Sequence, residues 1–174
     1  MEAFLEILKY ILPALVVFAS VYFIMKRFFD QQYGLEALQF KQKQFEHTLP
    51  LKLQAYERLL MFCERISIPN LMLRLQSPNS TVEQLEKSML IAIQQEYEHN
   101  LTQQMYVSES LWKIITMAKN QTSDIVSTAA NNLNASDPGT YISREAIEVM
   151  KHSKANPLET AKKSIRKEVA ILFG

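Results

Sequence analysis

Glycine is scarce in this sequence, and its scarcity excludes several kinds of site. Only Gly34, Gly139 and Gly174 occur in 174 residues. Loops that cradle phosphate groups and the tight turns of β-hairpins both rely on glycine, because its backbone adopts conformations closed to other residues. The shortage argues against a nucleotide-binding loop and against a fold rich in β-strands.

Cysteine is almost absent as well. The single Cys63 rules out an internal disulfide, which fits a reducing compartment. It ends the apolar stretch Leu59-Leu60-Met61-Phe62-Cys63, whereas a nucleophilic thiol needs a basic partner in an electropositive pocket. We therefore expect a buried structural cysteine.

An excess of one charge is also missing, since 19 basic residues face 18 acidic ones. The densest basic group, Lys162, Lys163, Arg166 and Lys167, has no aromatic neighbours and is followed by Glu168. Nucleic-acid binding calls for a denser basic stripe with aromatic residues, so we expect a solvated helix face and no nucleic-acid partner.

Signatures of catalysis are lacking too. There is no Gly-x-Ser-x-Gly motif, and the three histidines lack the context that would identify a general base. The sequence predicts neither enzymatic activity nor a cofactor.

The most informative feature present is an apolar run near the N-terminus. Tyr10 to Met25 contains no charged residue, and with its apolar flanks it reaches the roughly 20 residues that a bilayer requires. We expect a transmembrane anchor over residues 1–29, with the lipid bilayer as its first partner. The residues expected inside the membrane or at its surface include Tyr10, Leu12, Val16, Phe18, Tyr22 and Met25.

Two other interpretations of this run are weaker. A cleaved signal peptide has a basic start and small residues before the cut, whereas this N-terminus carries Glu2 and Glu6, and Ala19-Ser20 is followed by more apolar chain. A buried core helix would need more protein around it than the remaining chain provides.

Charges beside the run predict its orientation. Lys26 and Arg27 follow it directly, whereas Lys9 and the terminal amine are offset by the two N-terminal glutamates. The positive-inside rule then places the C-terminal domain in the cytoplasm.

Helical periodicity continues beyond the anchor. A stalk over residues 30–48 is expected to pack on the domain or on a second copy of the chain, through Leu35, Leu38, Phe45 and Leu49. Pro50 disfavours a helix at the residue before it, and Thr48 can cap a new one, so we expect a break there. The domain would then cover residues 49–174.

Six helices are expected in that domain, at about 50–66, 69–75, 80–104, 108–130, 141–152 and 157–173, with a loop over residues 131–140. Ser80 with Glu83 has the spacing of a capping box, Ser108 can cap the fourth helix, and Asn156-Pro157 can start the last. No stretch has the pattern of a strand. We expect an all-α protein whose short loops connect an antiparallel helical bundle.

The sharpest candidate for chemistry is the pair Glu96 and His99. Glu-x-x-His places both side chains on one helix face, as in di-iron bundles, but such a site needs a second copy of the motif and two more carboxylates. Glu57 and Glu64 could contribute, yet half a motif is weak. A polar cluster that pairs Glu96 or Glu64 with Arg58 or Arg65 is the simpler interpretation.

Two segments carry a resemblance to a known group. Leu49-Pro50-Leu51-Lys52-Leu53-Gln54-Ala55-Tyr56-Glu57-Arg58-Leu59, together with residues 96–108, resembles a family of uncharacterised Bacteroidota proteins, and the likeness spans roughly residues 10–130. It implies one N-terminal membrane helix, a cytoplasmic helical domain and a bacterial inner-membrane setting, and it brings no activity or cofactor. It also suggests a polar centre, either structural or a docking site, formed by Tyr56, Glu57, Arg58, Glu96, His99 and Asn100.

Three functional hypotheses remain. The first is a membrane-tethered, non-enzymatic interaction module, such as a scaffold or an accessory subunit of an inner-membrane complex. The second is a helical bundle that binds a metal or small ligand around Glu96 and His99. The third is a homo-oligomer formed through the stalk.

Overall fold

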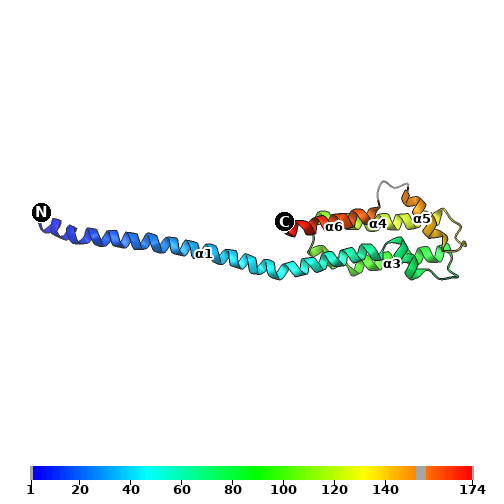
Figure 1. Cartoon of the computed structure of the whole chain (residues 1–174), viewed down its shortest axis with the longest axis horizontal. Coiled ribbons are helices and arrows are strands. Elements are labelled where there is room, and N and C mark those ends of the chain that lie inside the picture. Colours follow the sequence, from blue (N-terminus) through cyan, green and yellow to red (C-terminus); the bar gives the residue numbers. More distant parts are fainter. Residues whose placement is uncertain (1, 152–155, 174) are drawn as a thin grey trace. The chain divides into compact units, whose positions relative to one another are not determined.

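The computed structural model describes residues 2–151 and 156–173, and all regular structure in these ranges is helical. A single isolated bridge between Thr81 and Pro138 is the only β-type pairing among them. The prediction of an all-helical chain is thereby confirmed. The elements are α1 (Glu2–Arg65), α2 (Ile68–Leu75), α3 (Val82–His99), the 3-10 helix η1 (Leu101–Met105), α4 (Glu109–Asn131), α5 (Tyr141–Lys151) and α6 (Pro157–Phe173) (Figure 1).

The chain divides into two compact units, Met1–Leu49 and Pro50–Gly174, called unit 1 and unit 2 below. Unit 1 is helical wherever it is described. Within the described ranges, α1 is the one helix long and apolar enough to cross a membrane, and none of the described side chains in its most apolar segment is buried within unit 1.

The predicted break before Pro50 is wrong, because α1 continues to Arg65. The Thr48 hydroxyl does not cap a new helix. It donates to the carbonyls of Gln44 (2.9 Å) and Phe45 (3.3 Å) one turn back. A proline inside a helix removes one hydrogen bond at a cost of about 3 kcal/mol. Burial of the following turns, with Leu59 fully covered, outweighs that local cost.

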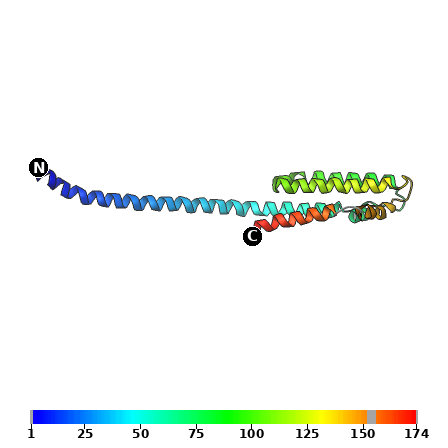
Figure 2. The ribbon, with the colours of Figure 1, turned by 90° about the horizontal axis from the view of Figure 1, so that it is seen from above.

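Unit 2 has its own hydrophobic core. The helix α4 packs against α3, α5 and α6, and Figure 2 shows α4 in yellow-green beside α3, with α6 beside the last turns of α1. Residues 50–65 of α1 face this core. The largest fully buried side chains are Leu59, Phe62, Ile66, Leu71, Val82, Leu85, Met89, Ile93, Leu111, Ile115, Ile142 and Ile165.

Most predicted helix starts agree with the structure. Ser108 accepts the Leu111 N–H (3.1 Å), Asn156 accepts the Leu158 N–H (3.0 Å), and Pro69 lies in the first turn of α2. These caps form from neighbouring residues, which explains why sequence patterns found them.

The expected bounds of the third helix were wrong at both ends. Its capping box is formed by Thr81 and Gln84, one residue later than predicted. The loop before α5 sets this start, because carbonyls of Asp137 and Ala135 accept the N–H groups of Val82 (2.9 Å) and Glu83 (3.2 Å). At the other end, α3 stops at His99 and the chain tightens into η1.

Candidate functional site

The residues predicted to lie in the membrane are all exposed where their side chains are described. The side chain of Leu12 lies outside the described residues. Nothing in unit 1 covers the others, although they are large and apolar, and the exposed fraction reaches 77% at Tyr10 and 71% at Phe18. The remaining exposed members are Val16, Tyr22 and Met25, and Lys26 and Arg27 beyond them are exposed too.

A second group of predicted residues comes together in unit 2. Arg58, Glu96, His99 and Asn100 line one open pocket of about 150 Å³, with Met61 and Arg65. The helix α1 supplies the arginines, and the C-terminal end of α3 supplies the glutamate and histidine. This surface is called the Arg58–His99 pocket below.

Glu96 is the electrostatic centre of the Arg58–His99 pocket. Its carboxylate lies 2.8 Å from Nε of Arg65 and 3.3 Å from Nη1 of Arg74, and only 13% of the side chain is exposed. Asn100 donates to the Glu96 carbonyl (2.8 Å) and ends the helix. The predicted pairing with Arg65 is confirmed. Arg74 was missed, because its place 22 residues before Glu96 leaves no local signal.

Two side chains of the pocket remain free. Neither Arg58 nor His99 hydrogen-bonds or forms an ion pair with any residue that the structure describes, and both are exposed. Since Glu96 already neutralises part of the charge of Arg65 and Arg74, the guanidinium of Arg58 gives the pocket an unpaired positive charge. Such a site suits a carboxylate from another molecule.

The other members of the predicted metal site lie elsewhere. Glu57 is exposed and outside the pocket, and the Glu64 carboxylate lies 2.6 Å from the ammonium of Lys162. Over residues 2–151 and 156–173, no group of three or more His, Cys, Asp or Glu side chains is placed to hold a metal ion. Glu96 is held by two guanidinium groups, which would compete with a cation for its oxygens.

Tyr56 contributes to a different cluster, near the C-terminal end of α6. Its hydroxyl donates to the Glu168 carboxylate (2.9 Å), which also accepts the backbone N–H (2.8 Å) and the hydroxyl of Ser108. Burial, reinforced by this carboxylate, raises the pKa of Tyr56 to about 12. The expectation of a solvated face around Glu168 was wrong for this residue.

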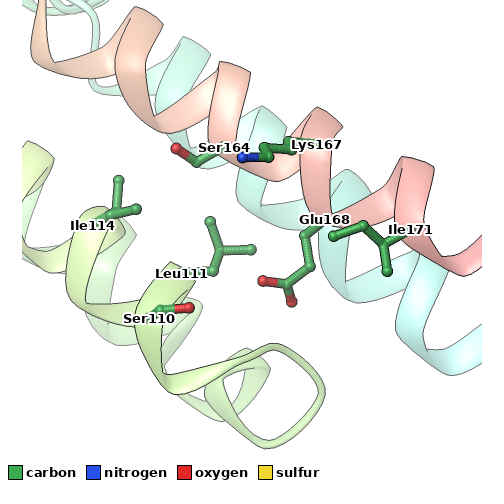
Figure 3. Close-up of a pocket in the computed structure, with 7 residues that line it drawn as sticks. All are labelled: Ser110, Leu111, Ile114, Ser164, Lys167, Glu168 and Ile171. Carbon is green, nitrogen blue, oxygen red and sulfur yellow. The ribbon is translucent and has the colours of Figure 1, made fainter.

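A partly apolar pocket of about 280 Å³ opens beside this cluster. Figure 3 shows the Glu168 carboxylate between α6 and the beginning of α4, with Leu111, Ile114 and Ile171 around it. The negative charge lies at the N-terminus of α4, where the helix dipole stabilises it. The cluster therefore holds α1, α4 and α6 together at one end of unit 2.

Replacing Glu168 with alanine should destabilise unit 2 by about 2 kcal/mol, because the Tyr56 hydroxyl and the Ser108 N–H lose their acceptor. Urea unfolding of the full-length protein in detergent, followed by fluorescence of the single Trp112, measures this loss. Glu109→Ala is the matched control, since that exposed carboxylate also lies at the start of α4 but, among the described residues, pairs only with Lys113. Equal unfolding curves for the two variants would contradict the role given to Glu168.

Lys162 is buried, contrary to the expectation of a solvated basic patch. Its ammonium lies between the carboxylates of Glu64 (2.6 Å) and Glu159 (2.9 Å), which compensate its charge.

Cys63 is fully buried, and burial raises the pKa of its thiol to about 12, so the prediction of a structural cysteine is confirmed.

The raised pKa values of Cys63 and Tyr56 predict how the stability of unit 2 depends on alkaline pH. The ordinary values are 9.0 for Cys63 and 10.0 for Tyr56, and both rise to about 12 in the folded protein. Their contribution to stability is fully present below pH 9 and is lost as pH rises toward 12, because the unfolded state then releases protons first. The free energy of unfolding, measured with urea at a series of pH values, should therefore fall less than in the parent protein. The difference should appear above pH 9 for Cys63→Ala and above pH 10 for Tyr56→Phe. Parallel pH profiles for both variants and the parent protein would refute this.

These observations define an all-helical protein with one long apolar helix at its N-terminus and a second unit that has its own core. The chain belongs to a family of unknown function, DUF7935, whose model matches residues 2–172. It matches no curated protein and no solved structure. The expectation that the family has no assigned function is confirmed.

Proposed function

We propose that this chain is a single-pass protein of the bacterial inner membrane whose cytoplasmic domain is an interaction module and not an enzyme. Residues 1–29 are the anchor, residues 30–48 the stalk, and residues 49–174 an antiparallel helical bundle. The module acts as a scaffold or as an accessory subunit of an inner-membrane complex. Its resemblance to small Bacteroidota membrane proteins supports the bacterial setting.

The observation that carries the proposal is the uncovered apolar segment of α1. Sixteen consecutive residues from Tyr10 to Met25 lack charge, and none of the side chains described in this segment is buried within unit 1. Water would oppose the exposure of such a surface, whereas the hydrocarbon of a bilayer accepts it. The exposed Lys26 and Arg27 at its C-terminal end support the cytoplasmic orientation.

The bundle is supported by the packing of α4 on α3 and α6, together with the short connections between helices. A non-enzymatic role is supported by the state of its polar groups. The Glu96 carboxylate is taken up by two arginines, the Glu168 carboxylate by Tyr56 and Ser108, and the Cys63 thiol is buried.

We place the partner contact at the Arg58–His99 pocket, because the unpaired guanidinium of Arg58 there can bind an acidic side chain of another protein. The test is affinity purification of the full-length protein from its native membrane, with co-purifying proteins identified and quantified. Arg58→Glu should lose a stoichiometric partner that the parent protein retains. Arg144→Glu, which changes another exposed arginine, on α5, is the control and should retain it. Purification of the chain alone would contradict the proposal.

Orientation has a separate test that uses the buried thiol. Since Cys63 is fully buried, a cysteine introduced at the exposed Ser136 is the only thiol accessible in the folded chain. A membrane-impermeant maleimide should label Ser136→Cys in inverted vesicles but not in intact cells whose outer membrane has been made permeable. Labelling in the intact cells would reverse the orientation.

A further inference from the structure

Residues 28–49 of α1 carry a seven-residue repeat. Steps of three and four residues from Phe28 generate the a and d positions of three heptads, and five of the seven positions are apolar. Three heptads are the minimum for which such a pattern indicates a coiled coil. The a positions are Phe28, Leu35, Gln42 and Leu49, and the d positions are Gln31, Leu38 and Phe45.

Four of the five apolar members of this seam are exposed within unit 1. Leu35 is 58% exposed and Leu38 is 66% exposed, although both are large aliphatic side chains. Phe28 and Phe45 are exposed as well, and Leu49 is half-buried. A mainly apolar seam of this length in contact with water is unfavourable and typically marks an interaction site.

Charges beside the seam indicate what covers it. Lys41 occupies a g position and Glu46 the next e position, and in a parallel two-stranded coil these positions of opposite chains face each other. Within one helix they are five residues apart and do not face each other. Their opposite charges therefore complement each other only across two copies of this chain.

The two polar core positions fit the same arrangement. Gln31 and Gln42 interrupt the apolar seam at one d and one a position. Polar side chains at such positions lower stability but fix register, because any shift would bury an amide against an apolar side chain. Gln42 also donates to the Glu46 carboxylate in its own helix (3.2 Å), which holds that carboxylate near the seam.

We propose that a second copy of this chain covers the seam, so that residues 28–49 form a parallel, in-register two-stranded coiled coil. Lys41 of each copy pairs with Glu46 of the other. The parallel orientation rests on the proposed function, because two anchors inserted the same way bring the seams together side by side. Confinement to one membrane also raises the effective concentration that a coil of three heptads needs.

Two neighbouring glutamines provide a matched cross-linking test. Gln42 lies at an a position and Gln44 at a c position on the outside of the coil, and cysteine at either site removes no apolar contact. In native membranes under mild oxidation, Gln42→Cys should form a disulfide-linked dimer at least ~10 times more efficiently than Gln44→Cys, because only core positions approach within disulfide distance. The native Cys63 is buried and does not contribute. Equal cross-linking at the two sites, or none at either, would overturn the proposal.

A charge exchange tests the pairing of Lys41 with Glu46. In the Gln42→Cys background, Lys41→Glu should lower dimer formation roughly tenfold, since it places two like-charge pairs across the symmetric interface. Adding Glu46→Lys should restore it. A double variant as weak as the single one would overturn the pairing.

A matched pair of phenylalanines tests the apolar seam. In the Gln42→Cys background, Phe45→Ala should abolish disulfide cross-linking. Phe40→Ala, at an outer f position of the same helix, should leave it unchanged. Equal effects would place the interface elsewhere. Fractionation of the same samples separates the two proposals: a membrane-bound protein without cross-links refutes only the coiled coil, and a cross-linked protein in the soluble fraction refutes only the anchor.

Discussion

Phe18→Arg should move this protein out of the membrane fraction. Phe18 lies at the centre of the uncharged run, where arginine costs about 3 kcal/mol of insertion free energy, a factor of about 100 in the insertion equilibrium. A second substitution, Val21→Arg, should raise the insertion free energy by about the same amount again. Fractionation of cells with alkaline carbonate extraction measures the result, because extraction releases peripheral proteins and retains inserted ones.

The control for this variant is Phe40→Arg, which changes the same residue type in the same helix. Phe40 is also exposed but lies outside the run, so its replacement should leave the protein in the membrane. If Phe18→Arg with the second arginine remained resistant to extraction, the membrane anchor would be refuted. If the Phe40→Arg protein were released from the membrane as readily, a charge within the uncharged run would not be the cause of release.

Phe62→Ala should destabilise unit 2 by about 3–5 kcal/mol, the usual cost of deleting a large buried aromatic side chain. Phe62 is 1% exposed, and its ring centre lies 6.2 Å from that of Tyr97, which in turn stacks on Trp112. The loss is a large fraction of the stability of a typical domain. Urea unfolding followed by fluorescence of Trp112 reads it directly, because the indole belongs to the same core.

Phe173→Ala is the matched control, since this phenylalanine is 66% exposed at the end of α6. Its replacement should shift the midpoint little. The comparison also tests whether residues 50–65 of α1 belong to the cooperative unit. If Phe62→Ala unfolded at the same urea concentration as Phe173→Ala, these turns of α1 would not be part of the core that Trp112 reports.

Local signals account for the parts of the fold that were predicted well. The start of α4 at Ser108 and that of α6 at Asn156 depend on side chains within three residues of the helix. The failure at Pro50 has the opposite origin. Proline and a preceding threonine are a genuine local stop signal, but contacts made by the next turns of the helix within unit 2 override it.

The candidate site was predictable only in part, for the same reason. Glu96, His99 and Asn100 are neighbours in sequence and share the end of one helix, so their meeting in one pocket required only that Arg58 lie opposite. Arg74 comes from the short helix α2, and no pattern around it points to Glu96. Tyr56 lies two residues before Arg58, yet its hydroxyl donates to Glu168 on α6, whereas Arg58 lines the pocket beside the end of α3.

The sequence by itself determined the apolar run, the all-helical character and most helix ends, because each depends on residues a few positions apart. Tertiary structure alone decided which carboxylates accept hydrogen bonds from distant parts of the chain. Glu168 accepts from Ser108, 60 residues before it, and from Tyr56, 112 residues before it. Such distances leave no periodic trace in a sequence. The pairing exists because packing around the core of unit 2 buries a phenol and a helix N-terminus that both need an acceptor.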